Sequence, residues 1–585
     1  MLNRFAFACL AVAVTAPPLA AQTIYPLDRA EILAGSRFDL KVEFPNAPAE
    51  GEVSVTVNGE PLSAALGGRP SFVQKEDGGT YSATWLRGAT IGRPGTYVVE
   101  AKQGSATSRV TWEVFGTAER RAKNVILFIG DGMSVAHRTA ARILSKGVKE
   151  GRYGGELAMD SLPFTSLVSS AGTDSIVTDS ANSMSAYTTG HKSCVNALGV
   201  YCARNRNTLD HPKVETIAEL VKRRAGGPLA VGVVTNTEIE DATPAGMVAH
   251  TRRRSDYNDI VEMFFDVKPD VMMGGGSPNF LPKATLGSKR TDDKNFVSLF
   301  SEAGWRFAPT RTEMLAQAAD DKTTRLLGLF NTGNIDGALD LKFLKKGSVS
   351  KFPDQPDLVD QTRAALSVLS RDPNGFVLMV ESGRIDKYSH SMDWERAVYD
   401  TIMLDNAVRA AKDFAADRDD TLIIVVGDHT HPVSIVGTYD DARPGDLLRD
   451  KLGVYAEAGV PNYPPADAEG YPPSVDVSRR LAFVFGAYPD HCETGKPYLA
   501  GENVPAVPEP GSRNVNVANE ANCAGPMAVR RQGNLGRDVS QGVHSGDDIV
   551  LSAMGPGAEL FRGRMDNTRV FRIMATALGL GSERR

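Results

Sequence analysis

Histidines and carboxylates occur together at three places in the second half of the chain. Asp386 and His390 stand four residues apart in DKYSH, Asp428 and His429 are adjacent in GDHTH, and His544 lies in HSGDD. A spacing of four places two side chains on the same helix face, one turn apart. Imidazole nitrogens and carboxylate oxygens are the ligands of catalytic zinc sites, which leave a position open for water or substrate. These residues therefore predict a two-zinc centre, which is suited to hydrolysis.

A histidine that stands alone in the sequence can be a hydrogen-bonded residue of the core rather than a metal ligand. We favour that role for His137, His211 and His491. For Asp428 and His429, which directly follow the apolar run TLIIVVG, we favour metal binding, because an unpaired buried charge would be costly there.

Four apolar segments predict neighbouring strands, and each runs directly into acidic residues. The segments are NVILFIGDG, PLAVGVVTNTEIEDA, GFVLMVESGRID and TLIIVVGDHTH. Amphipathic helices between them indicate an α/β fold with a mostly parallel, doubly wound sheet. In such sheets the ligand crevice lies beyond the carboxyl ends of the strands. One rim should therefore gather Asp131, Asp241, Glu381, Asp386 and Asp428.

Ser180 lies in TDSANSMSAYTTG, a segment that opens a predicted helix. Taken alone, Thr178, Asp179 and Ser180 are better explained as helix-capping residues. The alternative is a nucleophile, because backbone N–H groups at a helix N-terminus favour an alkoxide and a bound phosphate. A serine hydroxyl needs a base or a metal for this role, and the predicted metals would supply it.

The elements that position these residues fall into two parts. Short β-rich runs separated by turn residues predict a small immunoglobulin-like β-sandwich over residues 22–118, and this part contains no histidine. The segment that begins at Gly116 indicates a linker, and residues 119–585 are predicted to form the α/β domain. A stretch rich in Pro, Gly and Asp at about 432–543 is interpreted as a large insertion over the site.

The first 21 residues are typical of a cleavable signal peptide, with Arg4 ahead of an apolar run and small residues at Ala20 and Ala21. The alternative, an uncleaved anchor, is disfavoured because the run is shorter than the roughly 20 residues that span a bilayer. Neither a later spanning segment nor a lipid-anchor tail is evident. We expect a periplasmic or secreted protein without a membrane anchor.

Four of the five cysteines remain after the predicted cleavage, and they form two local pairs, Cys194 with Cys202 and Cys492 with Cys523. An even number in an exported chain favours two disulfides over a zinc site, because neither pair has C-x-x-C spacing. The formal charge is -6 and the chain has no long basic run, so nucleic acid is not an expected partner.

Six segments occur in an order that resembles the site motifs of the alkaline phosphatases. They are NVILFIGDGM, TDSANSMSAYTTGHKS with NALGV, DATPAGMVAH, MVESGRIDKYSH, GDHTH and HSGDD, and they extend from Asn124 to Asp547. The resemblance covers roughly the last four-fifths of the chain and leaves the β-sandwich outside.

The resemblance implies a role for each matching residue. Ser180 would be the nucleophile that becomes phosphoserine, and Arg254, eleven residues after Thr243, would bind phosphate. One Zn²⁺ would be held by Asp386, His390 and His544, and a second by Asp131, Asp428 and His429, next to Ser180. One Mg²⁺ would be held by Asp131, Thr243 and Glu381, which all offer oxygen.

Further matches would tune this site. Asp241 and Lys387 stand where bacterial members carry these residues and animal members carry histidines, and His431 would support a zinc ligand. Arg252 and Arg253 adjoin Arg254, so the sequence leaves open which arginine reaches inward. Asn182 and Ser183 depart from the smaller residues that are usual in the family, which leaves the range of substrates open.

The resemblance implies an enzyme with broad activity on phosphate monoesters. One alternative is a phosphodiesterase of the same superfamily; a sulfatase is disfavoured, because the chain lacks a C/S-x-P-x-R motif. Another is an exported binding protein with an inactive second domain, which the intact motifs disfavour. The sequence is compatible with a homodimer.

Overall fold

The computed structural model describes residues 22–461, 463–496 and 504–581. The predicted signal peptide, residues 1–21, lies outside these residues. The chain divides into two compact units. The first consists of residues up to Ala30, Phe38–Ala89 and Gly95–Glu113, and the second of Glu31–Arg37, Thr90–Pro94 and the chain from Val114 onward. The predicted domain boundary at residue 118 and the immunoglobulin-like type of the first unit stay predictions.

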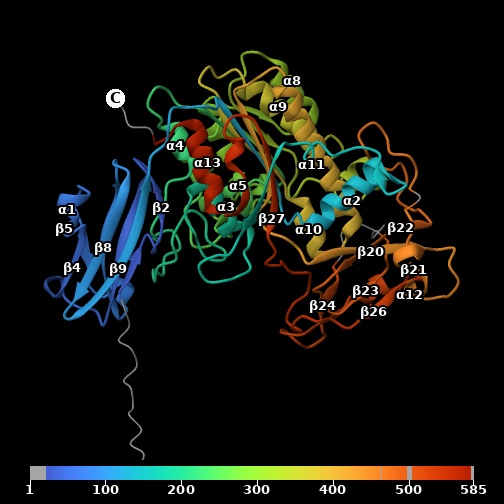
Figure 1. Cartoon of the computed structure of the whole chain (residues 1–585), viewed down its shortest axis with the longest axis horizontal. Coiled ribbons are helices and arrows are strands. Elements are labelled where there is room, and N and C mark those ends of the chain that lie inside the picture. Colours follow the sequence, from blue (N-terminus) through green and yellow to red (C-terminus); the bar gives the residue numbers. More distant parts are fainter. Residues whose placement is uncertain (1–21, 462, 497–503, 582–585) are drawn as a thin grey trace, which may run out of the picture. The chain divides into compact units, whose positions relative to one another are not determined.

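The first unit is all-β, as expected (Figure 1, blue). One sheet has the order β1 (Thr23–Tyr25), β3 (Arg37–Pro45), β7 (Tyr81–Thr90), β6 (Ser71–Val73). A second contains β9 (Ala106–Phe115), β8 (Gly95–Gln103), β4 (Val53–Val57) and β5 (Glu60–Pro61), in that order. Strands β3, β4, β7, β8 and β9 overlap the β-rich runs RFDLKVEF, EVSVTVNG, TYSATW, TYVVEAK and RVTWEV of the sequence.

Strand β3 is buried along both of its sides. Phe38 contacts Trp112 with ring centroids 5.6 Å apart. On the other side, Nζ of the buried Lys41 lies 2.8 Å from Glu43 and 2.7 Å from Glu76. These pairs offset part of the free energy needed to remove the charges from water.

The second unit is built on a mostly parallel ten-stranded sheet, which confirms the predicted fold class. Its order is β16 (Arg306–Ala308), β17 (Leu326–Leu329), β15 (Val271–Gly275), β14 (Ala230–Glu238), β18 (Phe376–Ser382), β10 (Asn124–Gly130), β19 (Thr421–Gly427), β27 (Ile549–Met554), β13 (Phe164–Ser169), β28 (Gly563–Asp566). Strand β27 runs antiparallel to both of its neighbours. The four predicted strands, β14, β18, β10 and β19, lie side by side at the centre.

Apolar side chains of the central strands point alternately into two cores. In β10, Val125 and Leu127 lie in one core, and Ile126 and Phe128 lie in the other. Because both faces are covered, these strands are apolar throughout rather than alternating.

Helices of the second unit supply the other side of each core. Residues of α3 (Ser180–Thr189), α4 (Ile217–Lys222), α5 (Ala242–Ala245), α6 (Tyr257–Val267), α7 (Phe296–Glu302) and α13 (Thr568–Leu578) belong to the first core. Residues of α2 (Val135–Lys146), α8 (Arg311–Ala319), α9 (Leu358–Leu369), α10 (Arg384–His390) and α11 (Trp394–Ala415) belong to the second.

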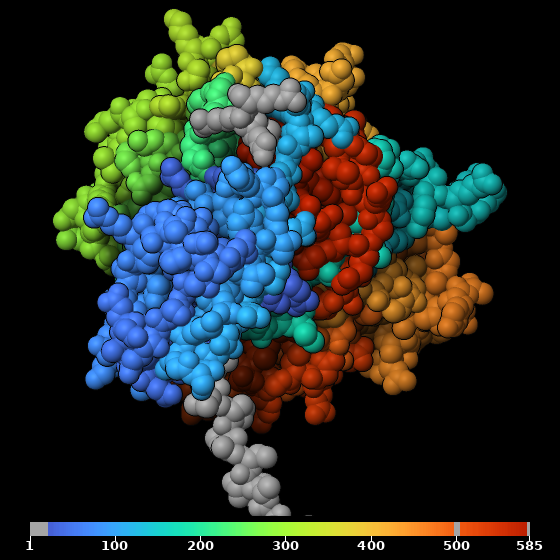
Figure 2. Space-filling view, turned by 60° about the vertical axis from the view of Figure 1, so that its left-hand side comes forward, coloured from blue at the N-terminus to red at the C-terminus, as the bar shows by residue number. Residues whose placement is uncertain are grey.

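Segments far apart in sequence meet at one edge of the sheet. Strand β13 pairs with β27 and β28, which come almost 400 residues later along the chain. Figure 2 shows the C-terminal residues (red) at the surface next to the teal part of the chain, which includes β13.

The predicted insertion forms several small sheets (Figure 1, orange to red). Strands β21 (Leu452–Gly453), β20 (Val433–Asp440) and β22 (Arg479–Phe485) form one sheet. Strand β23 (His491–Glu493) pairs with β26 (Val529–Arg531), and β24 (Ala506–Pro508) pairs with β25 (Asn516–Ala518).

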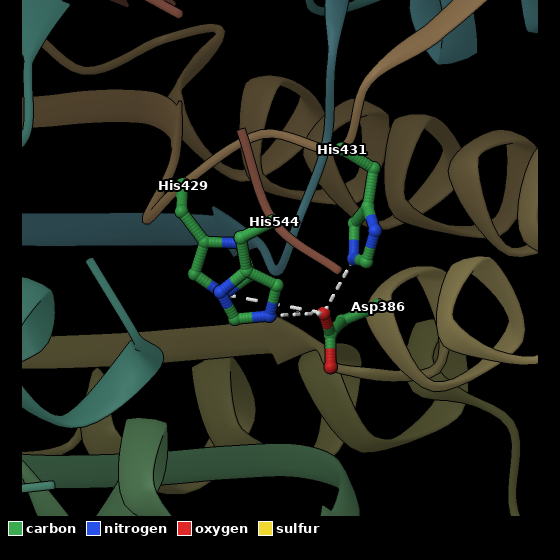
Figure 3. A group of neighbouring side chains, drawn as sticks. All are labelled: Asp386, His429, His431 and His544. Carbon is green, nitrogen blue, oxygen red and sulfur yellow. Dashed lines mark hydrogen bonds and ion pairs between the residues drawn. The ribbon is translucent and has the colours of Figure 1, made fainter. Parts of the chain in front are cut away.

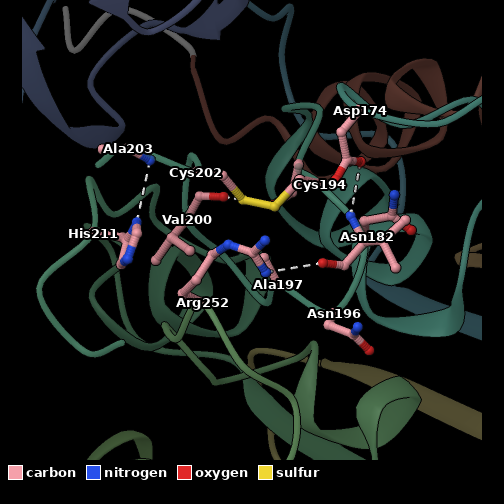
Figure 4. Close-up of a disulfide and its surroundings, with 12 residues drawn as sticks. Asp174, Asn182, Cys194, Asn196, Ala197, Val200, Cys202, Ala203, His211 and Arg252 are labelled. Carbon is pink, nitrogen blue, oxygen red and sulfur yellow. Dashed lines mark hydrogen bonds between the residues drawn. A yellow bond between two sulfur atoms is a disulfide. The ribbon is translucent and has the colours of Figure 1, made fainter. Parts of the chain in front are cut away.

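The four cysteines pair as predicted. Cys194 is bonded to Cys202 (Figure 4), and Cys492 is bonded to Cys523, 31 residues later. Among the helices of the described residues, none has the length and apolar character needed to cross a membrane.

Candidate metal centre

The ends of β10 and β19 bring two carboxylates together. Gly130 pairs with Gly427 in the sheet, so Asp131 and Asp428 leave it side by side. One ligand atom each from Asp131, Asp428 and His429 lie within 4.8 Å of one another, and all three residues are buried. Nε2 of His429 is 3.1 Å from Oδ1 of Asp131 and 3.4 Å from Oδ2 of Asp428.

Gly132 allows the chain to turn tightly beside this group. Its backbone N–H donates to Oδ1 of Asp428 at 3.0 Å. Its φ is +67°, and a Cβ there would lie 2.7 Å from the ring of His431. A side chain at this position would therefore displace a residue of the site.

Ser180 is the first residue of α3 and points into the same group. Its Oγ is 3.2 Å from Nε2 of His429, and the residue is 2% exposed. Asp179 is the N-cap, and its side chain accepts from the backbone N–H of Asn182 at 3.2 Å. Because Asp179 caps the helix, the Ser180 hydroxyl is left for another role.

The two residues that depart from the family pattern have internal partners. Oδ1 of Asn182 accepts from the backbone N–H of Asp179 at 3.1 Å, which completes a capping box. The hydroxyl of Ser183 donates to the carbonyl of Asp428. Asn182 therefore stabilises the start of α3 itself, and Ser183 ties that helix to the segment that carries Asp428.

A second group of possible ligands surrounds Asp386 (Figure 3). Ligand atoms of Asp386, His429, His431 and His544 lie within 4.8 Å of one another. Oδ1 of Asp386 is 2.7 Å from Nε2 of His431 and 3.3 Å from Nε2 of His544. His431 thus lies closer to Asp386 than the expected ligand His544 does.

His390 completes this second group. Its Nε2 is 3.3 Å from Oδ1 of Asp386 and 3.1 Å from Nε2 of His544. Its Nδ1 is 2.6 Å from the carbonyl of Gly542, and Nδ1 of His544 is 2.9 Å from the carbonyl of Thr178. A carbonyl can only accept, so Nδ1 carries the proton in both rings. In each ring Nε2, which faces Asp386, is thereby the nitrogen available to a metal.

Thr243 and Glu381 lie beside the first group. Oγ1 of Thr243 donates to Oδ2 of Asp131 at 3.4 Å. Oε2 of Glu381 accepts from the hydroxyl of Thr237 at 3.2 Å and from that of Thr235. The three residues expected to bind Mg²⁺ therefore lie on the neighbouring strand ends and on α5.

Buried carboxylates of this site lack compensating positive charge. Burial, followed by repulsion from Asp428 and Asp386, raises the pKa of Asp131 well above its ordinary value. Burial also raises the pKa of Glu381 to about 7 and that of Asp428 to about 6. Divalent cations would supply the missing charge and allow these groups to ionise.

The histidines show the complementary behaviour. Burial lowers the pKa of His390 to about 4 and that of His429 well below its ordinary value, so both rings are neutral at neutral pH. Burial alone would raise the pKa of Asp386, but His390, His431 and His544 outweigh it and hold that pKa well below its ordinary range. Burial would lower the pKa of His544, but Asp386 outweighs it and raises that pKa. His390 and His429 are thus the neutral imidazoles of the site, the form of histidine that binds zinc.

Four buried oxygen and nitrogen atoms of the site have no hydrogen-bond partner among the described residues. They are Oδ1 of Asp131, Oδ2 of Asp428, and the Nδ1 atoms of His429 and His431. Unpartnered buried polar atoms are costly in a folded protein. The two carboxylate oxygens fit a centre in which metal ions complete the coordination.

Arg254 lies at the edge of this centre and is held by two carboxylates. Its Nη2 donates to Oδ1 of Asp241 at 2.7 Å, and its Nη1 donates to Oδ2 of Asp179 at 3.2 Å. Nζ of Lys387 donates to the other oxygen of Asp241 at 2.7 Å. Burial would raise the pKa of Asp241, but Lys387 and Arg254 outweigh it and lower that pKa.

The neighbouring arginines point elsewhere. The Arg253 side chain is 62% exposed and pairs with Asp256 at 2.8 Å. Arg252 donates to the carbonyl of Val195 at 3.0 Å, near the Cys194–Cys202 disulfide (Figure 4). Among the three, Arg254 is the one that lies next to the helix start that carries Ser180.

Several supporting residues were missed by sequence reasoning. Thr235 and Thr237 hold Glu381, and Ser134 both donates to the backbone carbonyl of His431 at 2.7 Å and accepts from its N–H at 2.9 Å. The pattern T-x-T at a strand end places two hydroxyls on one face, a weak signal that could have been noticed. Nothing in the sequence connects Ser134 with a residue almost 300 positions later.

The lone histidines lie in the core as predicted. His137 and His211 are buried and hydrogen-bonded, and burial lowers the pKa of His137 to about 3. His491 is 7% exposed, and its Nδ1 is 3.0 Å from the carbonyl of Pro489.

Comparisons with known proteins agree with this geometry. A family model described as "Alkaline phosphatase" matches residues 122–580. The chain is 30% identical over 498 residues to the tissue-nonspecific isozyme of alkaline phosphatase from Gallus gallus, a match that covers 79% of this chain and 86% of that protein. It is 33% identical over 365 residues to the alkaline phosphatase of Escherichia coli strain K12, covering 56% and 74%.

Solved structures show the same fold. The alkaline phosphatase of Thermus thermophilus superposes with a TM-score of 0.56 at 24% identity, and the match covers 80% of this chain and 93% of that one. The cold-active alkaline phosphatase from Shewanella sp. superposes with a TM-score of 0.53 at 23% identity, covering 78% and 99%.

Proposed function

Because this chain belongs to the alkaline phosphatase family, a family of phosphomonoesterases, we propose that it is an exported, metal-dependent enzyme that forms a phosphoserine at Ser180. The observation that carries the proposal is the position of the Ser180 hydroxyl, 3.2 Å from Nε2 of His429, beside the buried group of Asp131, Asp428 and His429.

The proposed cofactors are two Zn²⁺ and one Mg²⁺. Asp386, His390 and His544 would hold one zinc, and Asp131, Asp428 and His429 the other. Thr243 and Glu381, with Asp131, would hold magnesium. When bound, such ions polarise phosphoryl oxygens and lower the pKa of hydroxyl groups and water.

Ser180 acts as the nucleophile in this mechanism. Its Oγ forms a bond to phosphorus, and the bond between phosphorus and the alcohol oxygen breaks. The alcohol leaves after taking up a proton. Water then attacks the phosphoserine, the Ser180 oxygen leaves, and inorganic phosphate is released.

Arg254 and the start of α3 bind the phosphoryl group. The planar guanidinium can donate two parallel hydrogen bonds to two phosphate oxygens. The first backbone N–H groups of α3 point outward from its N-terminus and favour negative charge there. Both groups contact the phosphoryl part of the substrate, so this part of the site accepts many monoesters.

Export rests on two features. The predicted signal peptide at residues 1–21 directs the chain across a membrane, and the disulfides Cys194–Cys202 and Cys492–Cys523 suit an oxidising compartment. We place the mature protein in the periplasm or the medium.

The proposal is tested by metal analysis and by rates on matched esters. Purified protein should contain two zinc and one magnesium per chain, and chelation should remove its activity. Initial rates should be highest on nitrophenyl phosphate, compared with bis(nitrophenyl) phosphate and nitrophenyl sulfate. A faster diester rate, or full activity without metal, would overturn it.

A further inference from the structure

A buried asparagine holds the turn between two of the expected metal ligands. Glu381, of the magnesium set, lies near the end of β18, and Asp386, of a zinc set, lies in the first turn of α10. Asn236 belongs to the neighbouring strand β14 and is 0% exposed. Its Oδ1 accepts from the backbone N–H groups of Gly383 at 2.9 Å and of Arg384 at 3.2 Å. Both N–H groups lie on the short stretch of chain that joins the two ligands.

This contact supplies the cap that α10 lacks. The N-cap residue is Gly383, which has no side chain to accept from the first N–H groups of the helix. Such groups have no partner inside a helix, so they need an acceptor from elsewhere. The side-chain oxygen of Asn236 is that acceptor, and it comes from another strand. The direction in which α10 leaves the sheet, and with it the position of Asp386, therefore depends on this asparagine.

The same turn is packed directly against Glu381. A Cβ on Gly383 would lie 2.3 Å from Cγ2 of Thr237 and 2.6 Å from Oε1 of Glu381. Only glycine fits at these distances, so a shift of the turn toward Glu381 would displace its carboxylate. The two ligands are thus coupled through a single piece of backbone.

Asp400 of α11 fixes the orientation of the Asn236 amide. Its Oδ1 accepts from Nδ2 of Asn236 at 3.0 Å, and its Oδ2 accepts from the backbone N–H of Ala338 at 3.1 Å. Asp400 is 0% exposed. An amide nitrogen can only donate, so the carboxylate beside it turns the amide oxygen toward Gly383 and Arg384.

We propose that Asn236 is a positioning residue, which holds Glu381 of the magnesium set and Asp386 of the zinc set at a fixed separation. This inference rests on the proposed function, because it concerns the metals assigned there. The other zinc set, Asp131, Asp428 and His429, follows β10 and β19, and β18 lies between these strands and β14. That set should therefore be insensitive to Asn236.

The test compares Asn236→Ala with a matched control, Asn124→Ala. Asn124 is 2% exposed, its Oδ1 accepts from the N–H of Phe376 at 3.3 Å, and its Nδ2 donates to Asp420 at 3.3 Å. It links β18 to a carboxylate as Asn236 does, but at the opposite end of that strand from the ligands. A loss of stability alone would affect both variants alike.

We expect the Kd of Mg²⁺ to rise about tenfold in Asn236→Ala, and one of the two zinc ions to bind more weakly by a similar factor, as is usual when a residue that orients metal ligands is lost. The other zinc ion should keep its affinity, and Asn124→Ala should keep all three. Calorimetry for Mg²⁺ and chelator competition for zinc measure these affinities without turnover. Unchanged affinities in Asn236→Ala, or an equal loss in Asn124→Ala, would overturn the inference.

A reciprocal exchange gives a second test, which also applies if Asn236→Ala does not fold. In Asp400→Asn one N–H group faces another whichever way the new amide turns, so Mg²⁺ should again bind about tenfold more weakly. Adding Asn236→Asp restores all four hydrogen bonds, with donor and acceptor exchanged between positions 236 and 400, and should recover the wild-type Kd. The buffer is alkaline, because burial raises the pKa of Asp400 to about 7 and the comparison needs its ionised form.

The outcomes separate this inference from the proposed function. If the double variant binds Mg²⁺ as weakly as Asp400→Asn does, the positioning role is wrong, while an active, metal-loaded wild type still supports the proposed function. A wild type that binds neither zinc nor magnesium would contradict the proposed function and the positioning role together.

Discussion

Replacing Arg254 by alanine removes a guanidinium that contacts Asp179, the N-cap of α3. In the substrate-free protein its two terminal nitrogens donate to Asp179 at 3.2 Å and to Asp241 at 2.7 Å. A bound phosphoryl group would accept some of the hydrogen bonds that the guanidinium now donates to Asp179 and Asp241. The loss should therefore appear in phosphate binding and in transition-state stabilisation, while the protein still folds.

The magnitude follows from the hydrogen bonds exchanged. Two bonds to a charged phosphoryl group contribute about 3 to 6 kcal/mol, and part of this is offset by the contacts with Asp179 and Asp241 that must be given up. A net loss of about 3 kcal/mol corresponds to a decrease in kcat/KM of roughly 150-fold. Arg254→Lys keeps the charge but not the planar fork, so an intermediate loss of about tenfold is expected.

The assay is kcat/KM for nitrophenyl phosphate together with the inhibition constant of inorganic phosphate. Arg253→Ala is the matched control, because this adjacent side chain is 62% exposed and pairs with Asp256. Zinc content should be the same in all variants. The reasoning is refuted if Arg254→Ala keeps more than a third of the wild-type kcat/KM, or if Arg253→Ala loses as much.

Three further predictions concern the nucleophile, the magnesium site and the insertion. Ser180→Ala should abolish the burst of phosphoenzyme while leaving metal content nearly unchanged; an undiminished burst would exclude it as nucleophile. Burial raises the pKa of Glu381 to about 7, so below that pH a cation must displace a proton from this carboxyl group. The apparent Kd for Mg²⁺ should therefore rise about tenfold for each pH unit of acidification. A constant Kd between pH 7.5 and 5.5 would contradict this. Replacing Cys492 and Cys523 by serine opens a link over 31 residues and should lower the free energy of unfolding of the insertion by about 4 kcal/mol. This would be seen as a lower calorimetric transition temperature; an unchanged transition would count against it.

The sequence was most informative where a local pattern sets the structure. The runs that end at Asp131, Glu381 and Asp428 are apolar throughout because the central strands are covered on both faces, so both the strands and their common rim could be predicted. The start of α3 was predictable for a similar reason, since capping depends on residues only three positions apart.

Features that depend on distant contacts could not be predicted. The choice among Arg252, Arg253 and Arg254 depends on which side chain meets Asp179 and Asp241, a matter of tertiary packing. His431 was expected to support a zinc ligand, and its Nε2 is 2.7 Å from Asp386, but no pattern in the sequence shows that Ser134, from another segment, holds its backbone.

A pocket beside the insertion is the clearest case of such a feature. Its aromatic lining residues are Trp394, Tyr439, Phe483, Phe485 and Tyr488, and no spacing in the sequence relates them. Only the folding of the insertion onto the start of α11 brings them together.

Asp179 belongs to two structures at once, the cap of α3 and the ion pair of Arg254. The orientation of the nucleophile and the resting position of the arginine therefore share one carboxylate. A double-mutant cycle over Asp179 and Arg254 should consequently be strongly non-additive. Because both roles depend on Asp179, a substitution of Asp179 or of Arg254 alone would disturb the site more than a joint substitution. The two residues should therefore be exchanged together in evolution.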